Sequence, residues 1–257
     1  MTQLTTRPRT ALVTGGAQRL GRSIALALAA DGWDVAVHYH GSQDAALATV
    51  AEIQALGRRA HSVQHDLAGA GDIAPLLDAC EAALGPVHCV VNNASLFEHD
   101  NAASFTLESL EAHMRTNVAA PVRLALALHG RLPADGHGVV VNLLDQKLWN
   151  PNPDFLSYTL SKSALESATG LLARALGPRL RVVGVAPGIT LAAKGQTAGS
   201  FEAAHRATPL GRGSTPGDIG AAVVFLVNAP AVTGTTLLVD GGQHLVPTAR
   251  DIMFLTS

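Results

Sequence analysis

Three side chains in the middle of the chain have the types and spacing of a proton-transfer site. Tyr158 and Lys162 are four residues apart, so on a helix both project from one face. A nearby ammonium favours tyrosinate and lowers the pKa of the phenol towards a useful range for proton transfer. Asp145 directly follows the apolar run 138–144 and precedes Tyr158. We therefore expect Asp145, Tyr158 and Lys162 to form a catalytic set. A tyrosine and a lysine on an exposed helix face are the alternative interpretation.

A second candidate site is the glycine-rich stretch TGGAQRLG, residues 14–21, which lies between an apolar run and a helical pattern. Gly15 and Gly16 would let the backbone approach a pyrophosphate, whose charge the N-terminus of the following helix stabilises. Gly21 falls in the first turn of that helix. Arg19 stands where a third glycine is expected, so it either points into solvent or adds a charge for a phosphate. The stretch predicts a dinucleotide site, with an ordinary tight turn as the alternative.

The end of the next apolar run indicates which dinucleotide binds. An NAD site would offer a carboxylate to the ribose about twenty residues after the turn. The chain has instead His38, Tyr39, His40 and Ser42, with no carboxylate before Asp44. Imidazole, hydroxyl and backbone donors suit a 2′-phosphate, which an acid would repel. The segment therefore favours NADP over NAD, unless these are polar strand-end residues without a ligand.

Polar residues also follow the third and fourth runs. Asp66 could accept a hydrogen bond from the adenine amino group, and Asn93 and Ala94 would line a cofactor cleft at the carboxyl edge of a sheet. Each of them could instead be a strand-end cap.

The elements that must position these residues alternate along the whole chain. Apolar runs rich in Val, Ile and Leu occupy residues 10–14, 34–39, 60–66, 88–93, 138–144, 181–186 and 235–240. Continuous rather than alternating hydrophobicity is typical of parallel strands covered on both faces. Helical patterns fill the gaps, such as 22–32 with a stop at Gly32 and 201–206. We predict one α/β domain over residues 1–257: a Rossmann-type, doubly wound parallel sheet of about seven strands between helices.

Composition excludes several classes of protein. Only 15% of the 257 residues are charged, against a typical quarter, which indicates surface buried between copies of the chain, in a homo-oligomer. A net charge of −2 gives no footprint for nucleic acid or an anionic membrane. No apolar run reaches the length of a membrane span, and no signal peptide is evident. Cys80 and Cys89 fit buried thiols better than a disulfide or a metal site. We expect a cytoplasmic protein.

The motifs TGGAQRLG, NNAS, YTLSK, APG and VDGG, together with Asn117, resemble those of the short-chain dehydrogenase/reductase family over nearly the whole chain. RLGRSIALAL, HYHGS, NNASLF and an Asp in place of the usual catalytic Ser resemble the pteridine reductases and the related dihydromonapterin or dihydrofolate reductases. The resemblance implies an NADPH-dependent enzyme, usually tetrameric.

The resemblance also implies roles for individual residues. Asp145, Tyr158 and Lys162 would be catalytic, and Asn117 would help to hold Lys162 through a water. Phe97 would stack on a pterin opposite the nicotinamide, with Ser95 as a polar contact beside it. The predicted substrate contacts are Arg19, Ser95, Phe97, Asp145 and Tyr158. The predicted cofactor contacts (NADPH/NADP+) are Thr14, Gly15, Gly16, Arg19, Leu20, Gly21, His38, Tyr39, His40, Ser42, Asp66, Leu67, Asn93, Ala94, Ser95, Lys162, Pro187 and Gly188.

An aspartate in place of serine changes the chemistry that the site suits. A serine hydroxyl can donate to the alkoxide that forms when a ketone is reduced, whereas an ionised Asp145 would repel that charge and raise the pKa of Tyr158. A carboxylate suits a substrate with N–H groups, which favours reduction of a C=N bond in a reduced pterin. This argument fails if burial keeps Asp145 protonated.

Three segments depart from the family pattern or extend it. Gly41 stands where the subgroup often has a basic residue, which weakens the expected affinity for a 2′-phosphate. Residues 189–214 are expected to form a substrate lid. The tail, residues 243–257, ends in the apolar DIMFL and is hypothesised to dock on a neighbouring subunit, near the active site of that subunit. Trp149 and the stretch NPNPD after Asp145 either shape the pocket wall or form a rigid loop.

Three functions fit these residues. The first is NADPH-dependent reduction of a dihydropterin or dihydrofolate to the tetrahydro form. The second is a carbonyl or imine reductase that acts on an unrelated small molecule. The third is a catalytically idle NADPH-binding sensor, against which the intact Asp145, Tyr158 and Lys162 argue.

Overall fold

A seven-stranded parallel sheet forms the centre of the molecule. The computed structural model describes residues 9–192 and 197–255. Its strands are β1 (Arg9–Val13), β2 (Trp33–Tyr39), β3 (Ala60–Gln64), β4 (Val87–Asn92), β5 (Gly138–Leu143), β6 (Leu180–Pro187) and β7 (Thr236–Val239). They are ordered β3-β2-β1-β4-β5-β6-β7, and every neighbouring pair is parallel. The predicted fold class is confirmed, because all seven predicted runs are strands, with ends within two residues of those expected.

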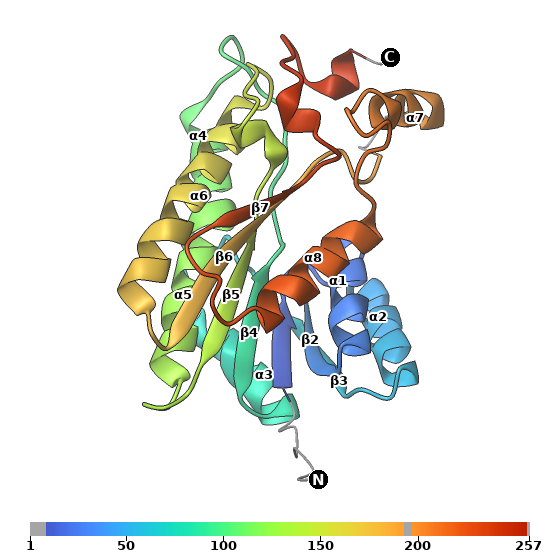
Figure 1. Ribbon diagram of the computed structural model, residues 1–257. Helices are drawn as coiled ribbons and strands as arrows, with labels where there is room; N and C mark the ends of the chain where they lie inside the picture. Colours follow the sequence, from blue (N-terminus) through green and yellow to red (C-terminus); the bar gives the residue numbers. More distant parts are fainter. Residues whose placement is uncertain (1–8, 193–196, 256–257) are drawn as a thin grey trace.

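Helices cover both faces of the sheet (Figure 1). On one face lie α1 (Arg19–Ala30), α2 (Gln43–Ala55) and α8 (Pro216–Asn228), and on the other α3 (Ala74–Leu84), α4 (Leu107–Met114), α5 (Ala120–Arg131) and α6 (Leu156–Leu176). Helix α7 (Ala198–Arg206) lies apart from both layers, at the end where the C-terminal turns also lie. Shorter turns are η1 (Arg115–Ala119), η2 (Gln146–Leu148), η3 (Gln243–Leu245) and η4 (Ile252–Phe254).

The strand sequences explain why both faces are covered. Along β1, Ala11 and Val13 pack towards α1 and α8, and Leu12 between them packs towards α3 and α5. All three side chains have no exposed surface. Consecutive apolar residues thus feed two cores, as strands between two helix layers require. Cys80 and Cys89 belong to these cores as free buried thiols, and burial raises the pKa of each to about 12.

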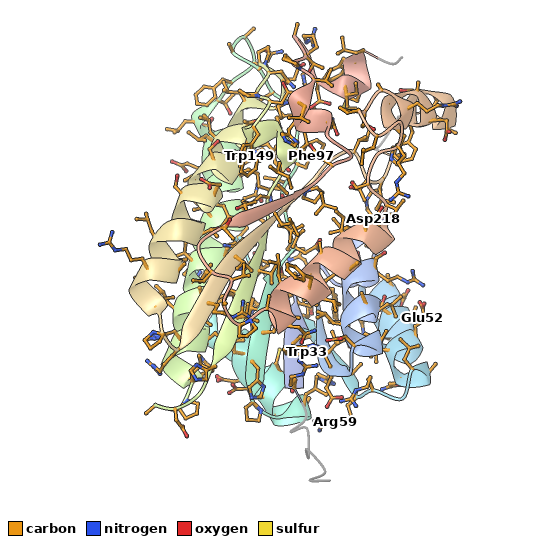
Figure 2. All side chains as sticks on the ribbon, viewed as in Figure 1. Trp33, Glu52, Arg59, Phe97, Trp149 and Asp218 are labelled. Atoms are coloured by element: carbon orange, nitrogen blue, oxygen red, sulfur yellow. The ribbon has the colours of Figure 1, made fainter. Side chains whose placement is uncertain are left out.

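The topology brings the candidate residues to one edge of the sheet. The chain reverses its strand order between β1 and β4, and ligands of open parallel sheets bind at the carboxyl ends of the strands at such a point. Figure 2 shows Phe97 and Trp149 at this end and Trp33 and Arg59 at the opposite one. Within the described residues, no helix is long and apolar enough to cross a membrane.

Candidate active site

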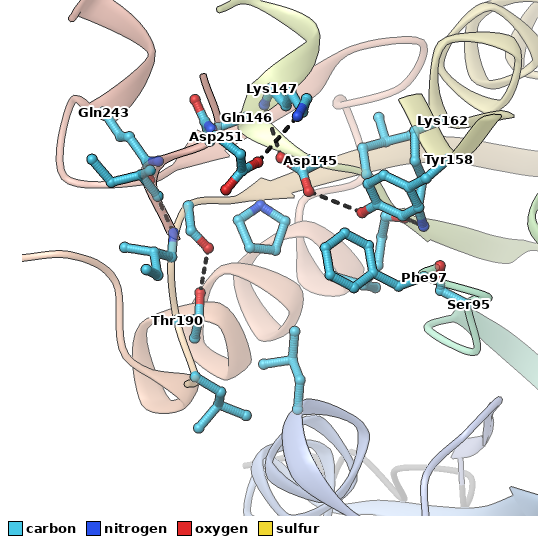
Figure 3. Close-up of a pocket in the computed structure, with 18 of the residues that line it drawn as sticks. Ser95, Phe97, Asp145, Gln146, Lys147, Tyr158, Lys162, Thr190, Gln243 and Asp251 are labelled. Atoms are coloured by element: carbon cyan, nitrogen blue, oxygen red, sulfur yellow. Dashed lines mark hydrogen bonds and ion pairs between the residues drawn. The ribbon is translucent and has the colours of Figure 1, made fainter. Parts of the chain in front are cut away.

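Helix α6 presents Tyr158 to Asp145. The helix begins at Leu156, and its first turn is fixed by the buried Asp100, whose carboxylate accepts the Ser157 N–H at 3.0 Å. An acceptor at a helix N-terminus satisfies donors that have no partner inside the helix. The next residue in this first turn is Tyr158, whose hydroxyl donates to Asp145 Oδ2 at 2.9 Å. The other carboxylate oxygen, Oδ1, accepts the Lys147 N–H at 2.8 Å. Asp145 is therefore oriented from both sides (Figure 3).

The electrostatics of this group differ from the sequence prediction. Burial, and then the adjacent Asp145, raise the pKa of Tyr158 well above its usual value. Burial also raises the pKa of Asp145 and lowers the pKa of Lys162 to about 8. The expected lowering of the phenol pKa by Lys162 is thus wrong, because burial and the neighbouring carboxylate raise this pKa. Tyr158 keeps its proton and is ready to donate it.

Lys162 lies behind the tyrosine and is held by the sheet. Its side chain is buried, and Nζ donates to the Leu143 carbonyl oxygen at 2.7 Å, at the end of β5. The ammonium lies 5.7 Å from the centre of the Tyr158 ring. Lys162 and Tyr158 thus share one helix face, as predicted.

Asn117 connects two walls of the site. It lies in η1, a single π-helical turn, and has no exposed surface. Its Oδ1 accepts the Leu96 N–H at 2.8 Å and the Ser95 hydroxyl at 3.2 Å. Its Nδ2 donates to the Leu96 carbonyl and to Ser161 Oγ, both at 3.0 Å. Asn117 therefore anchors the segment after β4 to α6, next to Lys162. The predicted water-mediated link to Lys162 stays a prediction.

Phe97 forms an aromatic wall beside the tyrosine. Its ring stacks on Phe155 with centroids 4.4 Å apart and meets Tyr158 edge-on at 4.7 Å. Although packed in this way, Phe97 keeps 48% of its surface exposed. A large half-exposed ring beside a proton donor offers a flat partner to a planar substrate.

These residues surround one cavity of about 470 Å³, within the range of small-molecule sites. The predicted residues that line it are Arg19, Leu20, Asn93, Ser95, Phe97, Asp145, Tyr158, Lys162, Pro187 and Gly188. The structure thus brings together the catalytic set, the glycine-rich turn and the ends of β4 and β6.

The glycine-rich turn fits a dinucleotide phosphate. Gly15 has a φ of +60°, which favours glycine, and a Cβ on Gly21 would lie 2.1 Å from the Gly15 carbonyl oxygen. The helix thus comes closer to the turn than any side chain would allow. At the start of α1, Gln18 makes no side-chain cap hydrogen bond and the first turn has no acid. An uncapped helix N-terminus is a ready anion site.

Arg19 occupies the first position of α1 with a φ of +53°, in the left-handed region that glycine prefers. Arg19 therefore stands at the position of the expected third glycine and also adopts the left-handed backbone conformation that a glycine would favour there. The guanidinium Nη2 donates to the Ala192 carbonyl oxygen at 2.9 Å, in the predicted lid. Residues 193–196 of that lid lie outside the described residues. Arg19 thus stands between the turn and the lid, exposed and at the cavity.

Three predicted cofactor contacts have side chains that are engaged within the protein, so a contact with the cofactor through them stays a prediction for their backbone alone. His38 is 2% exposed: Nδ1 accepts the Gly15 N–H at 3.0 Å and Nε2 lies 3.1 Å from the His65 carbonyl oxygen. Both ring nitrogens are engaged, and burial lowers the His38 pKa to about 4. The Thr14 hydroxyl is also buried and bonds to the backbone of β4 and of the residues after it. The Leu67 side chain lies in the core. None of the three side chains is available to a 2′-phosphate.

The remaining residues of that corner stay available. His40 and Asp66 are exposed and face each other, with His40 Nδ1 3.8 Å from Asp66 Oδ1. Tyr39 is half-buried, and Ser42 stands at the N-terminus of α2 without using its side chain as a cap. A Cβ on Gly41 would meet nothing within 4 Å, so a basic residue would fit there.

Several residues of the cavity were missed by sequence reasoning. They are Gln146 and Lys147, and the tail residues Gln243, Asp251, Ile252 and Met253, which were not among the predicted site residues. Thr190 also lines the cavity, from within the predicted substrate lid. The tail was hypothesised to dock on a neighbouring subunit, which stays a prediction; within its own chain it lies against the loop that follows Asp145. Phe254 packs beside Phe155, with centroids 6.2 Å apart, and Asn150 Nδ2 donates to the Val246 carbonyl oxygen at 2.7 Å. The stretch NPNPD thus anchors the tail. The apolar character of DIMFL was the signal that this segment packs against other residues, and three of its members, Asp251, Ile252 and Met253, line the cavity.

Comparison with known proteins agrees with this geometry. The family profile described as enoyl-(acyl carrier protein) reductase, a short-chain dehydrogenase/reductase profile, matches residues 15–244. The chain therefore belongs to the short-chain dehydrogenase/reductase family, and it is an oxidoreductase of that family.

Two solved structures and one sequence relative illustrate the range of similar proteins. FolM alternative dihydrofolate reductase 1 from Brucella canis, complexed with NADP, is 40% identical, with a TM-score of 0.89 over 95% of this chain and 97% of that chain. A short chain dehydrogenase from Burkholderia cenocepacia J2315, in complex with NADP, is 35% identical, with a TM-score of 0.83 over 91% and 97%. The 3beta-hydroxysteroid dehydrogenase 1 of Eggerthella lenta is 33% identical over 93% of this chain and 95% of its own length. The predicted cofactor agrees with both structures.

Proposed function

We propose that the protein is an NADPH-dependent pteridine reductase that converts a dihydropterin or dihydrofolate to the tetrahydro form. The NADP-bound dihydrofolate reductase neighbour, 40% identical, supports both the cofactor and the substrate class. The cofactor would lie along the glycine-rich turn, with Arg19 and the uncapped start of α1 at its phosphates. Exposed His40 and half-buried Ser42 would contact the 2′-phosphate.

The observation that carries this proposal is the hydrogen bond from Tyr158 to Asp145 in a cavity walled by Phe97. A ketone reductase needs a second donor at the developing alkoxide. Here the neighbour of the tyrosine is an acceptor, which suits a ring with N–H groups. The half-exposed Phe97 would stack on the flat ring system and hold it beside the proton donor, which is the orientation that catalysis requires.

The residues of the site can account for both the hydride and the proton that the reduction adds to the substrate. NADPH, when bound, supplies a hydride to the carbon of the substrate C=N bond. The Tyr158 hydroxyl gives its proton to the nitrogen, since its raised pKa keeps it protonated beforehand. Asp145 Oδ2, which accepts from that hydroxyl in the resting site, then passes a proton from solvent back to the tyrosinate, and its raised pKa favours the transiently protonated carboxyl. The net reaction adds one hydride and one proton across the double bond and leaves NADP+.

The test is NADPH consumption with dihydrobiopterin, dihydromonapterin and dihydrofolate. We expect turnover of at least one of them, a loss of roughly 10²- to 10⁴-fold in kcat for Tyr158→Phe, and a loss of pterin turnover for Asp145→Ser. Ser163→Ala, on the exposed side of the same helix, serves as the control with unchanged rates. NADPH binding without reduction of any of the three would refute the substrate assignment and leave the family assignment intact.

A carbonyl reductase that acts on an unrelated small molecule is the second candidate. The hydroxysteroid dehydrogenase relative favours it, because its name implies a hydroxyl–ketone pair as the reacting group. Turnover of ketones without turnover of pterins would decide for it. In that case Asp145→Ser should raise the rate, since serine can donate to an alkoxide.

We also propose that the enzyme is a cytoplasmic homo-oligomer, a dimer or a tetramer. Large apolar side chains are exposed on the outer surfaces of helices and of the edge strand: Leu126 on α5, Leu160 and Leu171 on α6, Phe225 on α8 and Leu237 on β7. Such side chains are typical of surfaces that bury against another subunit. Light scattering of the purified protein tests the assembly, and a monomer would refute it.

A further inference from the structure

The last described residues of the chain form one wall of the catalytic cavity. Asp251, Ile252 and Met253 line it together with Asp145 and Tyr158. Figure 3 shows Asp251 pointing to Lys147, beside Asp145. We call residues 250–255 the C-terminal strap. The strap lies more than ninety residues from Tyr158 in sequence. It lines the cavity separately from the glycine-rich turn.

Two ion pairs fasten the strap to the loop between Asp145 and Tyr158. Arg250 Nε donates to both oxygens of Asp154, at 3.0 and 2.8 Å, and the Asp251 N–H donates to Asp154 Oδ2 at 2.8 Å. Asp251 Oδ2 lies 3.0 Å from Lys147 Nζ. The Asp154 and Lys147 side chains are only 3% and 4% exposed. Releasing the strap would leave these two buried charges without their main partners, which is costly.

Hydrogen bonds inside the strap and aromatic packing shape it. Asp251 Oδ1 accepts the Met253 N–H at 3.2 Å, and the Phe254 N–H donates to the Asp251 carbonyl oxygen at 2.9 Å, which closes the turn η4. The Phe254 ring also meets His99 at 5.3 Å between centroids. One carboxylate thus both pairs with Lys147 and caps the turn that carries Met253.

The strap is coupled to the catalytic carboxyl through Lys147. The backbone N–H of Lys147 holds Asp145 Oδ1, while its ammonium holds Asp251 Oδ2 and Asn152 Oδ1, the latter at 2.6 Å. Lys147 therefore sets the position of the strap relative to the proton-transfer pair. It touches no reacting atom and acts as a positioning residue.

We propose that the C-terminal strap is the specificity-determining wall of the substrate pocket in its own subunit, locked by the Lys147–Asp251 ion pair, with Met253 in contact with the substituent of the bound substrate. This inference rests on the proposed function only in that the cavity is the substrate site of the reductase. The ring to be reduced lies against Tyr158 and Phe97, and the strap selects among substituents by their size.

The first test needs no substrate. Hydrogen–deuterium exchange of the full-length protein should show protected amides at residues 251–255. Asp251→Ala should speed this exchange by at least about tenfold, because it removes a charge-assisted hydrogen bond and the cap together. Leu255→Ala, in the same strap but outside the cavity and half-exposed, is the matched control. Fast exchange in the unmodified protein, or equal exchange in Asp251→Ala, would refute the proposal that the Lys147–Asp251 ion pair holds the strap in place.

The second test measures specificity with two substrates that share a ring and differ in bulk, dihydrobiopterin and dihydrofolate. Met253→Ala should change the ratio of their kcat/KM values by roughly tenfold, mainly through KM, with an unchanged dissociation constant for NADPH. Leu255→Ala should leave the ratio as it is. An unchanged ratio in Met253→Ala would refute the proposal that the strap determines substrate specificity. If neither pterin is reduced by the unmodified protein, the proposed function fails, and the exchange experiment alone decides whether the strap exists.

Discussion

At the scale of single residues, the protonation states define the site. Tyr158 holds its proton because burial and Asp145 raise its pKa, whereas burial lowers the pKa of Lys162 to about 8. A reductase needs a proton donor, and the protonated hydroxyl of Tyr158 at the cavity can serve as one. Burial of the site destabilises the charged form of Lys162, whose Nζ donates to the Leu143 carbonyl oxygen.

Replacing this lysine should therefore stabilise the protein while it inactivates the enzyme. A pKa lowered from 10.5 to about 8 means that the unfolded chain binds the proton more tightly, so the charged lysine destabilises the folded state at pH 7. Lys162→Met should raise the free energy of unfolding by about 1–3 kcal/mol at pH 7. Between pH 8 and 10.5 the folded, unmodified protein no longer carries a buried charge on Lys162. The difference in the free energy of unfolding between Lys162→Met and the unmodified protein should therefore become smaller. Denaturant titrations at pH 7 and 9.5 measure it, and a constant gap would contradict the prediction.

Arg19 makes opposite contributions to stability and binding. Its left-handed backbone costs a residue other than glycine about 1 kcal/mol, while its charge is proposed to bind the cofactor phosphates. Arg19→Gly should leave the free energy of unfolding equal or higher by up to about 1 kcal/mol. It should also raise the KM for NADPH roughly tenfold. Arg19→Ala keeps the strained conformation and is the control: it should raise KM as much without the gain in stability. An unchanged KM in both variants would show that the guanidinium serves only the lid.

At the scale of elements, the glycine-rich turn depends on the neighbouring strand. The Gly15 N–H, at the end of β1, donates to the His38 ring near the end of β2. This requires a neutral imidazole whose Nδ1 is an acceptor. The turn proposed to bind the cofactor is thus held in place by a buried side chain of the neighbouring strand.

Acid should loosen this link. The His38 pKa is about 4 in the folded protein against 6.5 for a free histidine, so its contribution to stability is complete above pH 6.5 and is lost as the pH falls to 4. The total loss is about 3 kcal/mol. His38→Gln keeps an acceptor but does not titrate, so its free energy of unfolding should fall less between pH 7 and 4.5 than that of the unmodified protein. Equal slopes in urea titrations at these pH values would contradict this role of His38.

At the scale of the whole molecule, the strap makes each subunit's site self-contained. If chains with Tyr158→Phe and chains with Asp251→Ala are co-expressed and mixed oligomers are isolated through two tags, every site carries one of the two defects. Kinetics should then match those of Asp251→Ala alone, at half the number of active sites. A tail exchanged between subunits would instead recreate intact sites. Wild-type KM values in the mixed oligomer would therefore place the tail in the neighbouring subunit.

Local patterns in the amino-acid sequence determined the strands, the parallel sheet, the family and part of the cavity. Short continuous apolar runs that alternate with helical patterns are typical of strands buried on two faces, and the Tyr158–Lys162 spacing places both side chains on one face of α6. These signals are local, so no knowledge of the packing is needed to use them.

Only the tertiary structure decided which side chains meet and in what environment. His38 and Tyr39 are neighbours in sequence, but alternate residues of a strand face opposite sides, so one is buried under Gly15 and the other is half-exposed. The pKa of Tyr158 is raised by burial and by a carboxylate thirteen residues away, and not lowered by the lysine four residues away as the spacing had predicted. The strap reaches the cavity through pairs such as Lys147–Asp251 that are about a hundred residues apart. No spacing rule connects such residues, because their contact results from the packing of the complete chain.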